Sequence, residues 1–280
     1  VQASQINSDL TVGIDMAGVA SAVLKAHTGL ATVGFKLYGD GFLLEPTEAT
    51  KLTARDHRNA EIIRPLLNGR DVAARPRGMH VIDFGTRSLK ESHEWPVLFD
   101  LLRDRVKPHR DANANADISA RWWQFGHVRA QLRQASAGLA RIIVTAETAR
   151  HRIFLPVATE VAPEGKLFCI CVDDPFVLGV LSSRVHVDWS NSLAGRLGVG
   201  NDFVYNKSCF DAFPLPDPTQ DAKSRVAHLA ERLDKHRTDA LARDEKVTMT
   251  GMYNVVEKLR SGEALTAKER TVLVGFGGIP

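Results

Sequence analysis

The segment Phe213-Pro214-Leu215-Pro216 constrains the fold of this 280-residue chain more than any other feature. Two prolines so close together interrupt both helices and central strands, so the segment marks a boundary. Before it, strand-like and helix-like patterns alternate, and after it only helical patterns occur. We therefore predict a mixed α/β (α+β) domain over residues 33–216 and a small all-α domain over residues 217–280. Residues 1–32 are predicted to be a connector with one short helix, Met16–Ala26.

The spacing of apolar residues predicts the individual elements. Residues 33–45 alternate around Gly39-Asp40-Gly41 and predict a β-hairpin, and a helix starts at Pro46 with Thr47 as its candidate cap. Residues 176–197 predict a helix, and a break near Ser182-Ser183 is left open. The other predicted elements are strands at 79–84, 141–145, 153–156 and 166–172, and helices at 97–106, 128–139, 220–241, 250–259 and 266–274.

Positive charge is concentrated in one part of the chain. Residues 64–152 hold 16 Lys and Arg against 9 Asp and Glu, whereas the remainder holds 20 against 24, so the whole chain has a net charge of only +3. Most of these cations are arginines, which form bidentate hydrogen bonds with phosphate and with guanine. The distribution favours nucleic-acid binding; an arginine-rich surface without that role is the alternative.

The three cysteines, Cys169, Cys171 and Cys209, include no C-x-x-C pair and predict neither a disulfide scaffold nor a zinc site. Cys169 and Cys171 are predicted to lie in a buried strand. No apolar run approaches the roughly 18 residues of a membrane span, and the first residues do not resemble a signal peptide. A cytoplasmic location without a membrane partner is therefore expected.

Motifs for chemistry are sparse. An enzyme that methylates an exocyclic amino group with S-adenosylmethionine needs a Gly-rich strand-to-helix turn and an Asn/Asp-Pro-Pro-aromatic loop. The sequence contains no Pro-Pro pair. Gly39-Asp40-Gly41 is predicted to lead into a strand, and Gly275-Phe276-Gly277-Gly278 is followed by too few residues for a helix. No catalytic, cofactor-binding or metal-binding residue is therefore predicted.

One enzymatic alternative stays open, a self-contained metal-dependent nuclease. Glu164-Gly165-Lys166 has the Glu-x-Lys pattern of such enzymes, and Asp173 and Asp174 follow nearby, although a turn after Pro163 is the simpler interpretation. His186, on an apolar helix, is interpreted as a packed side chain rather than a base.

Two arginine-containing segments are candidates for contact with nucleic acid. Arg121-Trp122-Trp123-Gln124-Phe125 interleaves aromatic and polar residues, and at least one tryptophan is expected to anchor the core. Arg150-His151-Arg152 is a compact basic triplet between two predicted strands, suited to binding phosphate. A solvated turn is the alternative for the triplet.

Several segments, in order, resemble the C-terminal half of MmeI-like enzymes, which are type IIL restriction–modification proteins and their stand-alone methyltransferase relatives. Gln5-Ile6-Asn7 resembles the exit from the catalytic domain of that family, and Met252-Tyr253-Asn254 resembles its helical C-terminal domain. The segments between them that carry the resemblance are Arg64–Asp71, Val81–Phe84, Arg105–Asp111, Arg121–Gly126, Gly179–His186, Trp189 and Phe213–Pro216.

The resemblance implies adenine-N6 methylation of double-stranded DNA with S-adenosylmethionine as donor. It places the catalytic and cofactor residues in a domain upstream of this chain, which would make residues 1–32 the connector from that missing domain. Some relatives also carry a nuclease domain further upstream. Thr271–Pro280 departs from the expected helical pattern, so a truncated end is expected for the helical domain.

In such proteins bases are expected to be read by loops and by the segment before the Phe-Pro motif, here Arg196 to Lys207. Arg and Lys suit guanine, Asn suits adenine, and Asp suits cytosine; a polar loop that caps a helix is the alternative. The candidates for base readout are Arg196, Asn201, Asp202, Asn206 and Lys207. The candidates for phosphate contact are Arg70, Arg121, Arg150, His151 and Arg152.

The chain is thus predicted to be the double-stranded-DNA recognition module of a restriction–modification or related defence methyltransferase, working with an upstream catalytic domain of the same parent chain. The alternatives are the nuclease described above and an RNA-binding or protein-binding domain on the same scaffold.

Overall fold

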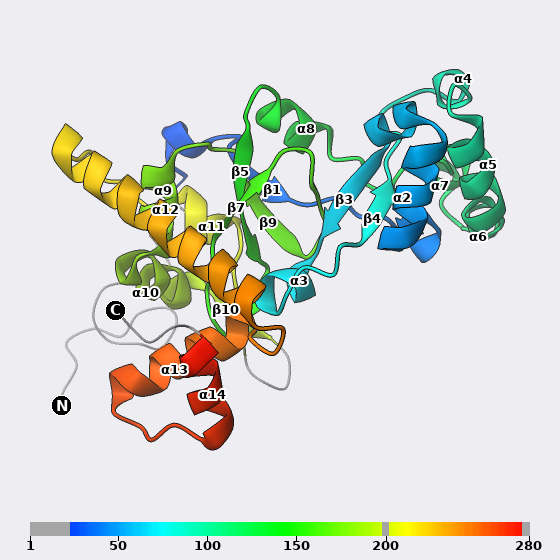
Figure 1. Ribbon diagram of the computed structural model, residues 1–280. Coiled ribbons are helices and arrows are strands. Elements are labelled where there is room, and N and C mark those ends of the chain that lie inside the picture. Colours follow the sequence, from blue (N-terminus) through cyan, green and yellow to red (C-terminus); the bar gives the residue numbers. More distant parts are fainter. Residues whose placement is uncertain (1–22, 198–201, 276–280) are drawn as a thin grey trace.

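A computed structural model describes residues 23–197 and 202–275 (Figure 1). Two four-stranded sheets form the centre of the molecule. The first is antiparallel and has the order β1 (Ala31–Val33), β9 (Leu167–Ile170), β5 (Arg141–Ala146), β7 (Leu155–Ala158). The second has the order β2 (Leu43–Leu44), β4 (His80–Ile82), β3 (Ile63–Leu67), β8 (Ala162–Pro163), and its β3–β8 pair is parallel.

A third, smaller sheet joins three short strands that are distant in sequence. Its order is β10 (Gly195–Leu197), β11 (Asp202–Val204), β6 (Thr148–Ala149), and both pairs are antiparallel. All residues of β10 are exposed, whereas every residue of β9 is buried. The short sheet is therefore a surface ribbon beside the central sheets, and we call it the β10–β11–β6 ribbon.

The buried strand predicted around the first two cysteines is confirmed. Cys169 pairs with Thr32 on one side and with Val144 on the other. Burial raises the pKa of the Cys169 thiol well above its usual range and that of Cys171 to about 11. Both thiols therefore stay protonated at neutral pH, as inert core side chains.

The predicted hairpin over residues 33–45 is wrong. β1 pairs with β9 of the first sheet, while β2 pairs with β4 of the second, so the two arms lie in different sheets. Between them the backbone turns at Tyr38 and Gly39, which have φ values of 53° and 135°, and forms the 3₁₀ turn η2 (Asp40–Phe42). A bulky residue such as Tyr38 seldom adopts a positive φ, so the sequence did not indicate that the backbone would turn at this residue.

Short helices cover the second sheet and extend to one end of the molecule (Figure 1). The helix predicted at Pro46 is confirmed, but its cap is Glu45 and not Thr47, because Pro46 occupies the first helical turn. The predicted helix at 97–106 is present and buries Leu98, Phe99 and Leu102. The helices of this region are α2 (Pro46–Arg55), α4 (Leu89–Ser92), α5 (Pro96–Arg105), α6 (Lys107–Asp111) and α7 (Ala116–Ala120), with the 3₁₀ turn η3 (His57–Glu61). Two further short helices contact the first sheet: α3 (Gly69–Ala73) contacts β5, and α8 (Ala130–Ser136) contacts β1.

The helix predicted over 176–197 is broken at the serine pair. Ser183 adopts an extended conformation and its hydroxyl accepts a hydrogen bond from the amide of His186, so it caps the next helix. The result is α9 (Pro175–Ser182) followed by α10 (Arg184–Leu193). A short helix, α11 (Lys207–Asp211), precedes the Phe-Pro motif.

Three helices follow the Phe-Pro motif, as predicted: α12 (Gln220–Arg243), α13 (Met249–Ser261) and α14 (Ala267–Gly275). α12 lies across α9 (Figure 1), and the contact is close because a Cβ on Gly179 would lie 2.6 Å from Cγ1 of Val226. Ala230 of α12 belongs to the same core cluster as Phe210 and Leu178. The helices beyond residue 216 thus pack directly on the segment before it, and the division into two domains stays a prediction.

Candidate nucleic-acid interface

The β10–β11–β6 ribbon carries the first two described candidates for base readout. Arg196 of β10 pairs with Phe203 of β11, which in turn pairs with Ala149 of β6, so the three residues form one row across the ribbon. The Arg196 guanidinium carbon lies 3.8 Å from the centre of the Phe203 ring. Asp202 pairs with Leu197. Asn201 lies outside the described residues.

The last two candidates for base readout flank the start of α11. Asn206 caps this helix, because its Oδ1 accepts a hydrogen bond from the amide of Cys209 at 3.3 Å. Lys207 lies 3.4 Å from a carboxylate oxygen of Asp211, and its side chain is exposed. Asn206 therefore caps the start of α11, whereas the alternative predicted from the sequence was a polar loop that ends the preceding helix, and base contact by either residue stays a prediction.

The Arg150–His151 pair follows directly on β6 and so lies at the edge of the ribbon. Arg150 is exposed and its Nη2 lies 3.3 Å from Oε2 of Glu257 on α13. His151 is half-buried, and its Nε2 lies 2.7 Å from Oδ1 of Asn254 on the same helix. The fold therefore brings two phosphate candidates beside the row that holds Arg196, although about fifty residues of chain separate them.

Arg152 points the other way, and its placement does not favour the predicted phosphate contact. It is buried, and its guanidinium donates hydrogen bonds to the Thr145 hydroxyl, to the carbonyl of Ala146 and to the carbonyl of Phe203. Burial lowers the pKa of this arginine to about 10, so it remains charged at neutral pH. Arg152 is an internal side chain that ties β5 to β11 and thereby holds the ribbon on the first sheet.

The other two phosphate candidates belong to helices and not to the ribbon. Arg70 is exposed on α3, and its guanidinium has no hydrogen-bond or ion-pair partner within residues 23–197 and 202–275. Arg121 is exposed at the end of α7, at the far end of the molecule from β10 (Figure 1). Next to it, Trp122 and Trp123 are both buried, which meets the expectation that at least one anchors the core. Phosphate contact by Arg70 and Arg121 stays a prediction.

His186 is the packed side chain that the sequence indicated. It is fully buried, its Nε2 lies 2.9 Å from the Tyr205 hydroxyl, and the Phe213 ring lies edge-on at 4.4 Å. Burial, with a smaller effect of the Arg152 charge, lowers the pKa of His186 to about 3. The imidazole is therefore neutral in the folded chain.

We expect this buried histidine to make stability depend on pH. Its pKa rises from about 3 in the fold to 6.5 in the unfolded chain, so the unfolded state takes up the proton as pH falls below 6.5. The linkage removes roughly 1.4 kcal/mol per pH unit, or about 2 kcal/mol between pH 6.5 and 5. Urea unfolding of His186→Gln should lack that slope, whereas the exposed His57→Gln should follow the unchanged chain. Parallel slopes for all three proteins would show that His186 is not buried neutral.

The carboxylates of the nuclease alternative are occupied and separated. Asp173 is bound by Arg141 at 3.0 Å, and Asp174 caps α9 and lies 2.9 Å from Lys223. Glu164 lies away from both aspartates, in the lining of a cavity that also includes Lys36 but neither Asp173 nor Asp174. Within the described chain, no group of three or more His, Cys, Asp or Glu side chains is placed to hold a metal ion. The geometry therefore gives the nuclease alternative no support.

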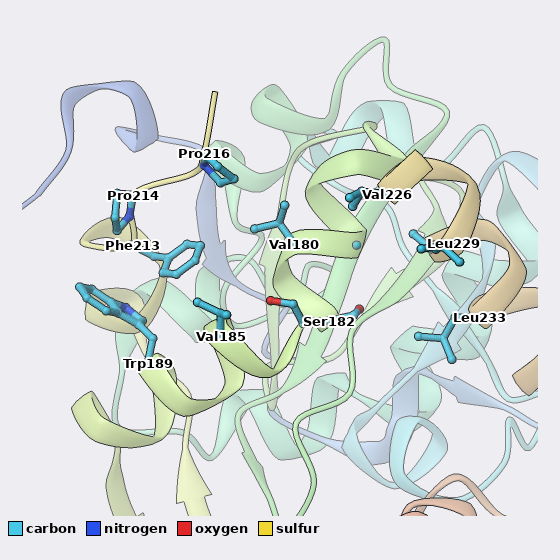
Figure 2. A pocket seen from close by; sticks show the side chains of 13 residues that line it. Val180, Ser182, Val185, Trp189, Phe213, Pro214, Pro216, Val226, Leu229 and Leu233 are labelled. Atoms are coloured by element: carbon cyan, nitrogen blue, oxygen red, sulfur yellow. The ribbon is translucent and has the colours of Figure 1, made fainter. Parts of the chain in front are cut away.

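An apolar groove of about 620 Å³ lies away from these charged residues, between α9, α10, α12 and the Phe-Pro motif (Figure 2). Val185, Leu229 and Leu233 line it and are exposed. Its lining offers no cationic side chain for phosphate and little hydrogen-bonding capacity for base edges. The groove is therefore not the candidate interface.

Sequence reasoning missed Phe203, Asn254 and Glu257. Phe203 lies between two polar candidates and could have been identified as the aromatic partner of an arginine. Asn254 and Glu257 lie about one hundred residues further along the sequence than their partners His151 and Arg150, and no local pattern indicates these contacts.

Taken together, these features define a recognition domain of mixed α/β fold, with cationic and aromatic side chains on an exposed ribbon. The chain belongs to the family of MmeI target recognition domains, since the family model described as "MmeI, target recognition domain" matches residues 24–217. This confirms the resemblance seen in the sequence. None of the helices in the described ranges combines the length and the apolar character needed to cross a membrane.

Two relatives agree with this assignment. DNA methyltransferase A of Bacillus subtilis (strain 168) is 26% identical over 118 residues, which are 40% of this chain and 12% of that protein. The type IIL restriction-modification enzyme MmeI, solved in complex with DNA, is 16% identical with a TM-score of 0.69, and the match covers 99% of this chain and 35% of the MmeI chain. At that identity the likeness shows the fold, and it confirms the predicted mixed α/β class with a helical C-terminal region. This chain spans only a small part of either relative.

Proposed function

We propose that this chain is the sequence-specific double-stranded-DNA recognition module of an adenine-N6 DNA methyltransferase in a restriction–modification or related defence system. The observation that carries the proposal is the row of Arg196, Phe203 and Ala149 with Arg150 and His151 at its edge. Membership of the MmeI target recognition domain family supports it. A cytoplasmic location is part of the same proposal.

Contacts to backbone phosphates and contacts to base edges would have different roles. Arg150 and His151 would bind backbone phosphates and set the position of the duplex, which carries no sequence information. Arg196 and Asp202 would reach base edges, where Arg suits guanine and Asp suits cytosine. Stacking on Phe203 restricts the Arg196 side chain, and a restricted side chain loses less entropy on binding.

Methyl transfer and S-adenosylmethionine binding are proposed for an upstream domain of the parent protein. The Gly39-Asp40-Gly41 segment supports this assignment, because it forms the 3₁₀ turn η2 before the short strand β2 rather than a turn that joins a strand to a helix. The sequence also has no Pro-Pro pair with which to hold a flipped adenine.

Binding to a mixed-sequence duplex at increasing salt tests the proposal. We expect the logarithm of the binding constant to fall linearly with the logarithm of salt concentration, by about 0.9 for each phosphate contacted.

With the cognate duplex, Arg196→Ala should cost about 1–3 kcal/mol at one base pair and relax specificity there, whereas Arg103→Ala, on the exposed face of α5, should have no effect. Absence of salt-sensitive duplex binding, or tighter binding to single-stranded RNA, would contradict the proposal.

A further inference from the structure

Helix α13 contacts both residues that the ribbon offers to phosphate. Glu257 pairs with Arg150, and Asn254 pairs with His151, at the distances given above. The ring of Tyr253 lies 5.9 Å from the His151 ring, and its hydroxyl accepts a hydrogen bond from Arg237 of α12. The segment Met252-Tyr253-Asn254, which the proposed function leaves without a role, thus lies directly behind the Arg150–His151 turn.

α13 is itself fixed to the rest of the chain. Met249, Met252 and Val255 are buried in one cluster with Ile153, which lies three residues beyond Arg150. At the start of the helix, the Thr250 hydroxyl donates to the carbonyl of Ala73 at 2.8 Å, and the amide of Met249 donates to the carbonyl of Ala74 at 3.1 Å. The helix is therefore a rigid support for the turn and not a loosely attached tail.

The two contacts to the turn differ in strength. His151 is half-buried, and its Nε2–H donates to Asn254 Oδ1, which sets the direction of the ring. Among the described residues Nδ1 of His151 has no hydrogen-bond partner, and in the imidazolium form, in which both ring nitrogens donate, it can donate to an external phosphate oxygen. By contrast, the side chains of Arg150 and Glu257 are 64% and 58% exposed, and exposed ion pairs of this kind are weak.

From this geometry we infer that α13 prepares the Arg150–His151 turn for phosphate. Asn254 is a positioning residue that holds His151, and Glu257 is an internal competitor that occupies the Arg150 guanidinium until a backbone phosphate replaces it. The inference rests on the proposed function. A phosphate displaces the carboxylate readily because Glu257 makes a single 3.3 Å contact with Nη2, whereas a phosphate can accept two hydrogen bonds from the guanidinium, and the released Glu257 is rehydrated at the surface.

The competitor role predicts a gain in binding. Glu257→Gln should tighten binding to a mixed-sequence duplex by roughly two- to fivefold at low salt, since an exposed pair no longer has to be broken. Arg150→Gln should weaken binding and reduce the salt slope by about 0.9. In the Arg150→Gln background, Glu257→Gln should lose most of its effect. A gain that persists in that background, or one equalled by Glu263→Gln on the exposed loop after α13, would instead show a general effect of net charge and overturn the competitor role.

The positioning role has a readout that needs no DNA. In histidine-labelled nitrogen spectra of the full chain without DNA, Asn254→Ala should shift the ring signals of His151, and Glu263→Gln should not. Asn254→Ala should also weaken duplex binding by roughly threefold, and less so in a His151→Ala background. Unchanged His151 signals would overturn the positioning role. Failure of the unchanged chain to bind duplex would overturn the proposed function, while the spectra would still decide whether Asn254 holds His151.

Discussion

Asp83→Ala should destabilise the chain by about 3–5 kcal/mol, the typical loss when one partner of a buried ion pair is removed. The Asp83 side chain is only 1% exposed and lies between two arginines: Arg64 Nη1 is 2.8 Å from Oδ2, and Arg133 Nη2 is 2.7 Å from Oδ1. The amide of Gly85 also donates to Oδ1 at 2.9 Å. Removal of the carboxylate leaves two partly buried cations without their counter-charge.

The surroundings of the two arginines explain why they cannot simply turn to water. Both guanidinium groups lie over the Phe35 ring, at 5.5 Å for Arg64 and 4.4 Å for Arg133. Arg64 also donates to the carbonyls of Thr159 and Val161, at the edge of the second sheet. These contacts hold the positive charges in place, so the cost of Asp83→Ala falls on the junction between β3, β4 and α8.

The pH dependence of this effect has a definite sign. Burial alone would raise the pKa of Asp83, but Arg133 and Arg64 together lower it below its usual 3.8. A lowered pKa contributes stability that is complete above the pKa of the unfolded chain and is lost as pH falls through that of the fold. The difference between the unchanged chain and Asp83→Ala should therefore be largest near neutral pH and shrink below about pH 3.8.

Urea unfolding followed by circular dichroism measures the loss. The matched control is Asp100→Ala, which removes an exposed carboxylate that pairs with Arg103 at 2.7 Å on α5 and should change stability by less than about 0.5 kcal/mol. A loss below 1 kcal/mol for Asp83→Ala would mean that water replaces the carboxylate and that the cluster does not hold the junction.

Local patterns predicted the helices better than the sheets. The break at Ser183 and the helices after Pro216 follow from caps and apolar spacing within a few residues. The hairpin prediction for residues 33–45 was wrong because strand partners are set by non-local packing: β1 finds β9 more than one hundred residues away. Asp83 was part of a recognised motif, yet nothing near it in sequence indicated that Arg133 would pair with it.

The candidate interface shows the same difference between local patterns, which the sequence reveals, and non-local packing, which it does not. The sequence identified the segments Arg196–Lys207 and Arg150–Arg152, and the structure brings these segments together through the pairing of β11 with β6. It did not reveal that Arg152 faces the interior while Arg150 faces solvent, because the side of the sheet that is covered depends on Tyr205 and Phe203. Which of the candidate residues touch DNA stays a prediction.

Gly34→Ala should be nearly as disruptive as the loss of Asp83, at about 3 kcal/mol, because a new methyl group would meet backbone rather than side chain. An added Cβ would lie 2.4 Å from the carbonyl oxygens of both Pro163 and Glu164. These atoms cannot give way singly, since the amide of Phe35 donates to the Pro163 carbonyl at 2.8 Å and the amide of Gly34 donates to the Leu167 carbonyl at 2.9 Å.

The place of Gly34 in the chain explains why the contact is so close. Gly34 follows β1 of the first sheet, and the next residue, Phe35, bridges to Glu164 beside the second sheet. The backbone therefore passes from one sheet to the other within a single step, and only a residue without a Cβ allows that approach. Any side chain here would force the two sheets apart and break hydrogen bonds on both sides.

Thermal and urea unfolding of Gly34→Ala beside Gly195→Ala separates this crowding from the general effect of replacing glycine. A Cβ on Gly195 meets nothing within 4 Å, so that variant should keep its stability to within about 0.5 kcal/mol. If the two variants were equally stable, the sheets could separate at no cost, and Gly34 would not fix their junction. If only Gly34→Ala loses stability, the close approach of the two four-stranded sheets requires a residue without a Cβ at position 34. The β10–β11–β6 ribbon is attached to the first of these sheets, so its support depends on the same approach.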